Sequence, residues 1–246
     1  MIEASRVMEI ARAIAPEGGI FVEAGANDGI RQSNTLLLER ELGWTGLLVE
    51  PSPSAFALLE LNRPNCVLVN SALVSSGDSR KVVSGAFLDG HLTGTLDPAL
   101  LDRVADVPTS KFQSLWVRIR RALGLKAKTT MVSVSTTSLT NALLDSPFNR
   151  VDLFSLDVEG FELQALSGLD FSRIKPKVII IEVRKNDMWQ IVHLLVDAGY
   201  LLIENLSNFE KTASATWTQD HEDFLFVAVE EFLSNSRLRE IFQTTL

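Results

Sequence analysis

The chain has 246 residues, of which 46% are hydrophobic and 22% charged, and its formal net charge is −8. This composition predicts one globular α/β domain spanning residues 1–246, and the acidic balance argues against general binding of nucleic acid. The apolar runs are strand-sized and no basic, apolar leader opens the chain, so neither secretion nor membrane spanning is indicated and a cytoplasmic location is expected.

The first helix is expected within residues 1–19. Apolar residues recur with helical spacing from Ile2 to Ile14, and the pattern ends before Pro16 and a pair of glycines. We expect this helix to cover the sheet or the mouth of a ligand site.

A strand, a glycine loop and a helix follow directly. The loop reads Glu23-Ala24-Gly25-Ala26-Asn27-Asp28-Gly29, and Ser33-Asn34-Thr35 opens the leucine-rich segment after it. Gly25 and Gly29 allow a sharp turn and the close approach of a ligand, and N–H groups at the helix start can bind an anion or a carboxylate. Asn27 stands where dinucleotide-binding folds have their middle glycine, so a nucleoside without pyrophosphate fits better.

A second strand, residues 47–49, ends in the acid Glu50. Glu50 lies about 20 residues after the second glycine, the spacing at which dinucleotide-binding folds place an acid on ribose hydroxyls. The glycine pattern alone also occurs as ordinary turn chemistry, but the two features together predict a nucleoside site at the carboxyl ends of neighbouring strands. Ser52 and Pro53 then suit the N-cap and the first position of a helix.

Cys66 is the only cysteine and excludes an internal disulfide. It begins a third predicted strand, residues 66–69, where a small buried hydrophobe is favoured. From residue 75 to residue 130 the alternation of strands and helices breaks, and glycines and prolines punctuate short segments. A connection of this length is typically a lid or a binding loop.

Basic and apolar residues recur at helical spacing within residues 111–128. This predicts an amphipathic helix with a basic face. It can be a docked helix with solvated charges, or a docking face for an acidic or lipid-linked ligand that also allows peripheral membrane contact.

Regular alternation returns after residue 130. A strand at 153–156 ends at Asp157, and a helix with Glu162 in its first turn follows. Because ligands lie at the carboxyl ends of strands in open α/β sheets, Asp157 should face the same crevice as Glu23 and Glu50. The other expected elements are strands at 131–134, 178–183, 200–203 and 224–228 and helices at 137–144, 188–198 and 230–242.

Three blocks of the sequence resemble the FkbM family of S-adenosylmethionine-dependent methyltransferases. They are residues 21–29, residues 43–51 and the Asp-Val-Glu-Gly-x-Glu block within residues 151–162. Two features depart from the family: Glu23 replaces a more usual aspartate, and residues 75–130 align with nothing in it. The resemblance implies a Rossmann-like class I fold, with a seven-stranded, mostly parallel sheet, helices on both faces, a final antiparallel pair and an irregular insertion.

The resemblance also implies S-adenosylmethionine as the cofactor, with its adenine at the end of the third strand. The expected cofactor-binding residues are Glu23, Gly25, Ala26, Asn27, Asp28, Gly29, Asn34, Glu50, Pro51, Ser52, Asn70, Ser71, Ala72 and Asp157.

Methyl transfer to oxygen needs a group that takes the hydroxyl proton. The candidates are Asp157, His91 and Glu159, with Glu182, His193 and His221 as alternatives. Asp157 is the best placed of them, although it could instead hold the methionyl ammonium group or order the crevice. His91 lies in the insertion, and a histidine can accept a proton at neutral pH. The sulfonium supplies the leaving group, so no metal is expected, but a magnesium ion bound by the carboxylates of Asp157, Glu159 and Glu182 stays an alternative.

The resemblance therefore predicts an O-methyltransferase that acts on a hydroxyl of a sugar, glycolipid or polyketide-like metabolite. The acceptor would be a small molecule or a glycan- or lipid-linked group, with its specificity set by residues 75–130. A short-chain dehydrogenase is disfavoured because Tyr200 is the only tyrosine and no Tyr-x-x-x-Lys pair exists. A non-catalytic member that uses the fold for binding or scaffolding remains the other alternative, and the sequence leaves the oligomeric state open.

Overall fold

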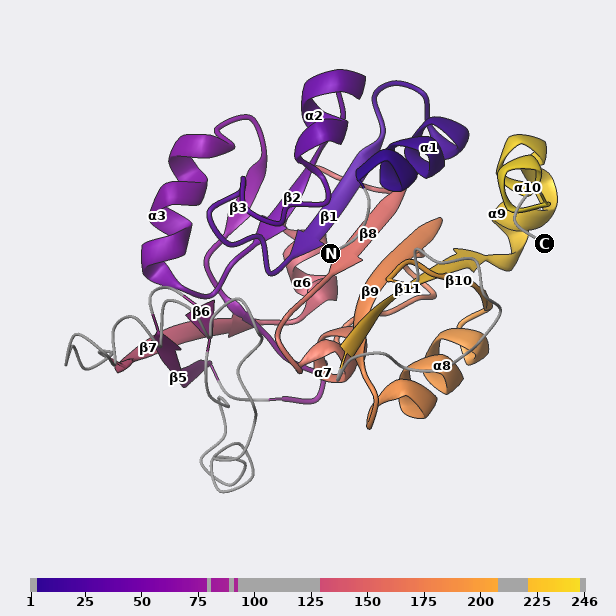
Figure 1. Ribbon diagram of the computed structural model, residues 1–246. Helices are drawn as coiled ribbons and strands as arrows, with labels where there is room; N and C mark the ends of the chain where they lie inside the picture. The colour runs from indigo at the N-terminus through magenta and orange to yellow at the C-terminus, as the bar shows by residue number, and fades with distance from the viewer. Residues whose placement is uncertain (1–3, 79–80, 89–90, 93–128, 208–220, 244–246) are drawn as a thin grey trace, which may run out of the picture.

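The computed structural model describes residues 4–78, 81–88, 91–92, 129–207 and 221–243 (Figure 1). Its main sheet has seven strands in the spatial order β3-β2-β1-β8-β9-β11-β10. β11 runs antiparallel to both of its neighbours, and the other neighbouring pairs are parallel. The strands are β1 (Ile20–Ala24), β2 (Thr45–Val49), β3 (Val67–Val69), β8 (Leu153–Leu156), β9 (Val178–Arg184), β10 (Tyr200–Asn205) and β11 (His221–Ala228).

This strand order confirms the predicted seven-stranded, mostly parallel sheet with a final antiparallel pair. The chain runs outward from β1 through β2 to β3, and later continues on the other side of β1 with β8 and β9. The strand order therefore reverses between β1 and β8. In open α/β sheets, ligands bind at such a point, outside the carboxyl ends of the strands.

Helices cover both faces of the main sheet, as expected for a parallel sheet with buried strands (Figure 1). α1, α2, α3 and α10 pack on one face, where Ile10 and Leu38 join a buried apolar cluster with strand residues. α6, α7 and α8 pack on the other face through side chains such as Leu166 and Ile191. The helices are α1 (Ala4–Ile14), α2 (Leu36–Leu42), α3 (Pro53–Asn62), α6 (Leu139–Leu144), α7 (Glu162–Leu166), α8 (Met188–Asp197), α9 (Val229–Ser234) and α10 (Ser236–Gln243).

Local sequence signals set several helix ends. The Ser52 side chain accepts a hydrogen bond from the Ala55 N–H at the start of α3, and Pro53 is the first helical residue. Ser138 caps α6 in the same way through the Asn141 N–H. α2 ends at Gly43, whose left-handed backbone has φ +62°. The Ser52 cap confirms the predicted start of α3, and α6 begins at Leu139, within the helix expected at 137–144.

The terminal helix predicted at 230–242 is wrong as one element, because the structure breaks it at Asn235 into α9 and α10. The Asn235 carbonyl oxygen Oδ1 accepts a hydrogen bond from the Leu238 N–H at 3.1 Å and so caps α10. Its side-chain amide donates to the Ala13 carbonyl at 3.0 Å, which ties the break to the end of α1. Capping and this tertiary contact outweigh the continuous helical periodicity of the segment.

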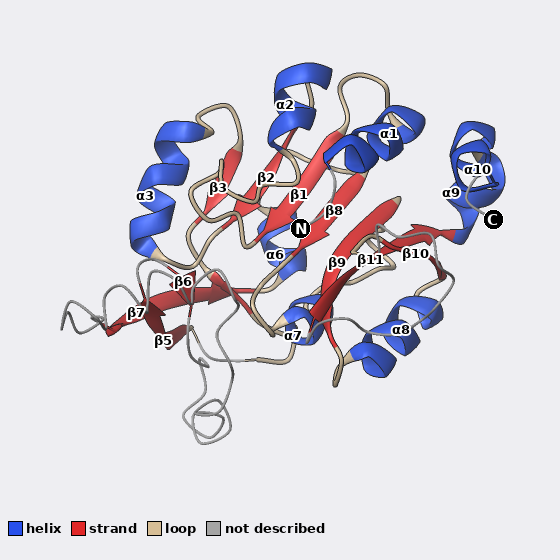
Figure 2. Ribbon diagram, viewed as in Figure 1, coloured by secondary structure: helices blue, strands red, loops and turns tan. Residues whose placement is uncertain are grey.

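The segment expected to be an irregular insertion contains regular strands that the sequence analysis did not predict. β5 (Val82–Leu88) pairs antiparallel with β7 (Thr129–Thr137) and with β6 (His91–Leu92), and β7 pairs with β4 (Ala72–Leu73). Together they form a separate four-stranded sheet, drawn below β3 in the view of Figure 2. The basic helix expected at 111–128 lies outside the described residues. In the described part of the chain, none of the helices combines the length and the apolar character needed to cross a bilayer.

A buried carboxylate joins three strands at the amino edge of the main sheet. Asp152 is 1% exposed, and its Oδ2 accepts a hydrogen bond from the Ile20 N–H, the first of β1, at 2.8 Å. Its Oδ1 lies 2.9 Å from Nζ of Lys177, which precedes β9, and Arg150 Nε lies 3.2 Å from Oδ2. Burial raises the pKa of Asp152, but the Ile20 N–H and these cations outweigh it and hold the pKa below its usual value.

We expect Asp152→Asn to destabilise the fold. The substitution leaves the partly buried Lys177 without its anion and weakens the contacts through which Asp152 joins β1, β8 and β9. The free energy of unfolding, measured by urea titration at pH 7, should fall by about 2–4 kcal/mol. Arg150→Ala is the matched control: that side chain is 58% exposed, and its loss should cost less than about 1 kcal/mol. Equal stability of Asp152→Asn and the wild-type protein would contradict this account.

Candidate cofactor and active site

An open cavity of about 710 Å³ lies at the carboxyl ends of β1, β2 and β8, at the point where the strand order reverses. The glycine loop after β1 lines one side, Glu50 and Pro51 after β2 line another, and Asp157 and Glu159 after β8 close a third. The structure therefore brings together the three strand ends that the sequence pointed to.

Gly25 and Gly29 make the sharp turns of the loop after β1. Gly25 has φ +85°, and a Cβ atom there would lie 1.7 Å from the carbonyl oxygen of Asp157. The Gly25 and Ala26 N–H groups donate to the carbonyl oxygen of Val49 at 2.9 and 3.1 Å, which fixes the loop to the end of β2. A side chain at residue 25 would therefore separate the loops that follow β1 and β8.

Glu50 holds the two loops that flank it while it faces the cavity. It is 7% exposed, and its carboxylate accepts hydrogen bonds from the Asn27 N–H at 2.8 Å and the Ser52 N–H at 2.7 Å. Burial raises the pKa of Glu50 to about 7, because these two hydrogen bonds offset only part of the lost hydration. Glu50 thus changes charge near neutral pH.

Glu23 also lines the cavity, but its carboxylate is engaged by the following loop. It is 4% exposed and accepts hydrogen bonds from the hydroxyls of Ser33 and Thr35 at 2.9 and 2.6 Å and from the Asn34 N–H at 2.8 Å. Burial raises the pKa of Glu23, against the lowering effect of the Thr35 hydroxyl and of Arg63. This geometry indicates that Glu23 organises the wall of the site.

Arg63, which the sequence analysis did not select, lies beneath the same loop with no measurable exposure. Its guanidinium donates to the Gly29 carbonyl at 3.2 Å, to the Thr35 hydroxyl at 3.1 Å and to Glu39. It also lies 3.8 Å from Glu23 and 5.4 Å from the Phe21 ring centroid. A cation that ends a helix looks like a surface residue in sequence, so only the fold shows its role.

Several other predicted cofactor residues are hydrogen-bonded to neighbouring residues. Asp28 is not among the residues that line the cavity, and it accepts the N–H groups of Ile30 and Arg31 at 3.0 and 2.8 Å. The Asn34 amide donates to the Ser155 hydroxyl at 3.0 Å, and both residues line the cavity. Ser52 serves as the cap of α3.

The end of β3 adjoins a second, smaller hollow of about 320 Å³. Ser71 and Ala72 line it together with apolar side chains that include Leu73 and Phe161, and it shares Pro51 with the larger cavity. Asn70 lies just outside and donates its side-chain amide to the Glu50 carbonyl at 2.8 Å. The predicted adenine-binding segment therefore borders this hollow, which we call the apolar slot. The slot adjoins the main cavity at Pro51.

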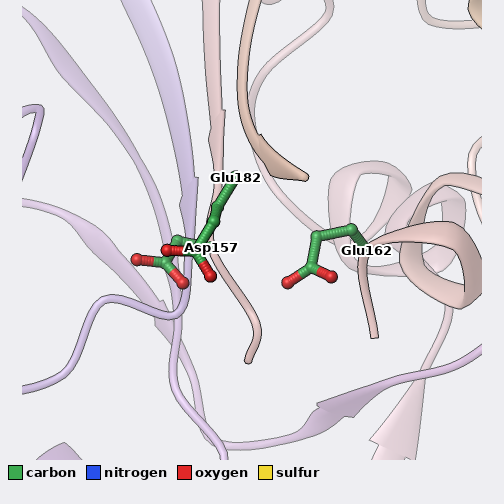
Figure 3. A group of neighbouring side chains, drawn as sticks. All are labelled: Asp157, Glu162 and Glu182. Atoms are coloured by element: carbon green, nitrogen blue, oxygen red, sulfur yellow. The ribbon is translucent and has the colours of Figure 1, made fainter. Parts of the chain in front are cut away.

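Three carboxylates converge beside the cavity: Asp157 after β8, Glu162 at the start of α7 and Glu182 in β9 (Figure 3). One oxygen atom from each lies within 4.8 Å of the others. Glu162 is 1% exposed and accepts the N–H groups of Val158 and Gly160 at 3.1 and 2.9 Å, so it caps the preceding loop. We call these three side chains the acid cluster.

Burial, and then repulsion between neighbouring carboxylates, raises the pKa of Asp157 and of Glu182 well above the ordinary range. Carboxyl groups this close can share a proton, take up a cationic ligand or hold a divalent metal ion. The cluster contains Glu162, where the sequence analysis considered Glu159 as a metal ligand. The expectation that no metal is required stays a prediction.

The remaining candidate bases are dispersed. Glu159 lines the cavity with a side chain that is 55% exposed and lies 3.8 Å from Arg184. His91 is in β6, opposite Leu88, and its side chain lies outside the described residues. His193 is exposed on α8, and His221 in β11 lies 3.6 Å from Glu182.

Residues that line the cavity but were not predicted from sequence include Arg31, Gln32 and Ser155. Within the described residues, three amino acids other than glycine have a left-handed backbone, Asn27 (φ +50°), Gln32 (φ +59°) and Glu159 (φ +57°). All three line the cavity. Such conformations are costly and concentrate at functional sites, and only Asn27 carries a residue type that signals one.

The strand order, with helices on both faces of the main sheet, is that of the class I, Rossmann-like methyltransferase fold. The chain matches the model of the methyltransferase FkbM domain over residues 23–234, and it belongs to this family. It is therefore an S-adenosylmethionine-dependent methyltransferase, as the sequence blocks predicted.

Similar solved structures include a TehB-like SAM-dependent methyltransferase from Corynebacterium glutamicum, at 11% identity over 90% of this chain and 86% of that one, with a TM-score of 0.44. Another is the precorrin-6y C5,15-methyltransferase from Geobacter metallireducens, at 10% identity over 91% of this chain and 86% of that one, with a TM-score of 0.46. No curated protein matches the chain significantly.

We expect the acid cluster to make the stability of the protein depend on pH. Because the pKa values of Asp157 and Glu182 are higher in the folded than in the unfolded chain, the folded state binds more protons. Their contribution to stability is complete below the unfolded pKa values of about 4 and is lost as the pH rises through the folded ones.

We expect Asp157→Asn to weaken this pH dependence, because it keeps the shape of the side chain and removes its charge. Between pH 5 and pH 8, the variant should gain on the order of 1–3 kcal/mol of unfolding free energy relative to wild type, measured by urea titration. Asp197→Asn, which removes an exposed carboxylate from α8, is the control and should leave the pH dependence unchanged. If the unfolding free energies of Asp157→Asn and wild type depend on pH in the same way, the pKa of Asp157 is not raised in the folded state.

Proposed function

We propose that this methyltransferase transfers the methyl group of S-adenosylmethionine to a hydroxyl oxygen of a sugar, glycolipid or polyketide-like metabolite. The observation that carries the proposal is the position of Asp157, a partly buried carboxyl group in the wall of the cavity and next to two further acids. A carboxylate whose pKa is raised is a suitable acceptor for a hydroxyl proton.

Residues along the cavity offer partners for the ribose and the adenine of the cofactor. Glu50 can accept hydrogen bonds from both ribose hydroxyls while the N–H groups of Asn27 and Ser52 keep it in place. The apolar slot beside Ser71 suits the adenine, with Asn70 and Ala72 at its edge. The bound cofactor supplies an electrophilic methyl group on a sulfonium.

Asp157 would act on the acceptor from the opposite wall. A cationic ligand beside Asp157 favours its ionised form, so the carboxylate is ready to take the hydroxyl proton when the site is loaded. Burial, and then repulsion from Glu159 and Glu162, raises its affinity for that proton. Glu159 and His91 remain the other candidate bases, and Glu159 has the exposure needed to reach an acceptor.

The acceptor itself is expected to meet residues 75–130, whose strand β5 lies beside β7 in the second sheet. A glycan- or lipid-linked acceptor, and peripheral membrane contact through residues 111–128, remain part of the proposal, because the basic character of that segment suits an anionic surface. A cytoplasmic location is also part of the proposal, because the apolar runs of the sequence are only strand-sized. A panel of hydroxylated acceptors tests the activity, and binding of the cofactor without any turnover would favour the non-catalytic alternative.

We expect Glu50→Ala to weaken S-adenosylmethionine binding about ten- to a hundredfold, because it removes a charged partner of the ribose hydroxyls. Calorimetric titration measures the affinity, and Glu60→Ala, an exposed acid on α3, is the control. The wild-type affinity should also rise with pH through about 7, where Glu50 ionises. Unchanged affinity in a folded Glu50→Ala variant would contradict the ribose assignment.

We expect Asp157→Asn to slow methyl transfer by about 10²–10⁴ in single-turnover experiments at saturating cofactor, the usual loss for a general base. If Asp157 holds the methionyl ammonium group instead, the loss should appear mainly as weaker cofactor binding. A variant that transfers methyl at the wild-type rate would leave Glu159 or His91 as the base.

A further inference from the structure

We infer that Arg31 binds the α-carboxylate of the cofactor's methionyl group and thereby selects for a ligand that carries this carboxylate. The inference rests on the proposed cofactor site and assigns a residue that neither the sequence blocks nor the family match pointed to. The apolar slot, Glu50 and Arg31 lie in different parts of the cavity lining, and the charged residues of the lining are mostly acids.

The lining residues differ along the cavity, and this difference indicates which part of the cofactor each region would bind. The apolar slot with Leu73 and Phe161 suits the base, and Glu50 at the end of β2 suits the ribose. Arg31 and Gln32 line the main cavity but not the slot. Since the methionyl group and the base are attached at different ends of the ribose, the part of the cavity lined by Arg31 and Gln32 receives the methionyl group.

The charges then distinguish the two ends of the amino acid. The charged side chains that line the cavity, within the described residues, are four acids and Arg31. Asp157 and Glu159 suit the ammonium group, but a carboxylate among acids is costly unless a cation or hydrogen-bond donors compensate it. Among the other donors nearby, the Asn34 side-chain amide gives one hydrogen bond to Ser155, and the Asn34 backbone N–H donates to Glu23.

Arg31 is held in a position to meet this need. The carboxylate of Asp28 accepts the backbone N–H of Arg31 at 2.8 Å through Oδ1, and its Oδ2 lies 3.5 Å from Nε of the same residue. That contact is made through Nε, on a different edge of the guanidinium from the one formed by the two terminal nitrogens. Two parallel hydrogen bonds from that terminal edge match a carboxylate.

The test compares two ligands that differ only in the carboxylate. S-Adenosylmethionine and its decarboxylated form both carry the adenosyl group, the sulfonium and the ammonium group, and calorimetric titration gives the affinity of each. Arg31→Ala should weaken binding of S-adenosylmethionine about tenfold, as expected for a charge-assisted pair at an exposed site, and should change binding of the decarboxylated form less than about twofold. Arg31→Lys should recover part of the loss.

The side chain of Arg31 is 77% exposed, so its replacement should leave the fold intact, and a thermal melt checks this. Arg40→Ala, which removes an exposed arginine from α2, controls for the change in net charge and should leave both affinities unchanged. An equal loss for both ligands in Arg31→Ala, or no loss for either, overturns the inference. Failure of the wild-type protein to bind either ligand would overturn the proposed cofactor site and the inference with it.

Discussion

The buried guanidinium of Arg63 is the group on which the cofactor loop depends. A cation without exposure is costly unless its donors are satisfied, and here they are satisfied by one particular arrangement of residues 29–39. Glu23 joins from β1 and accepts the hydroxyls of Ser33 and Thr35. Moving the loop away would leave this buried charge without its partners, so the contacts of Arg63 stabilise the observed conformation of the loop.

This arrangement also explains the opposite character of the two sides of the cavity. On the side of β1 and β2, carboxylates are occupied by N–H and hydroxyl donors and serve as fixed supports. On the side of β8 and β9, the carboxyl groups of Asp157 and Glu182 lie near further acids and hold their protons more tightly. The protein therefore keeps its least favourable electrostatics where a ligand with positive charge is expected, which is the usual cost of a reactive site.

Local signals predicted much of the fold. The strands of the main sheet, the glycine turn and the cap at Ser52 each depend on residues close in sequence, and the structure confirms them. The main cavity is lined by many of the residues predicted at the ends of β1, β2 and β8, because parallel strands place their carboxyl ends together.

The features that sequence reasoning missed depend on contacts between distant residues. Arg63 meets the Gly29 carbonyl across α2 and β2, and nothing in its own neighbourhood indicates burial. β5 finds its partner β7 across residues 89–128, beyond the reach of local patterning. The break at Asn235 depends on the carbonyl of Ala13, at the other end of the chain.

The dependence on Arg63 has a consequence for anyone who recombines this scaffold with others. The glycine loop is short enough to exchange as a cassette, yet the guanidinium that supports it comes from the far end of α3. The smallest unit that can be exchanged therefore begins with β1 and ends after residue 63. A loop exchanged alone would lose its hydrogen bonds with the buried Arg63. Exchange boundaries placed in the loop between α3 and β3 would respect this unit, while boundaries within α2 or β2 would divide it.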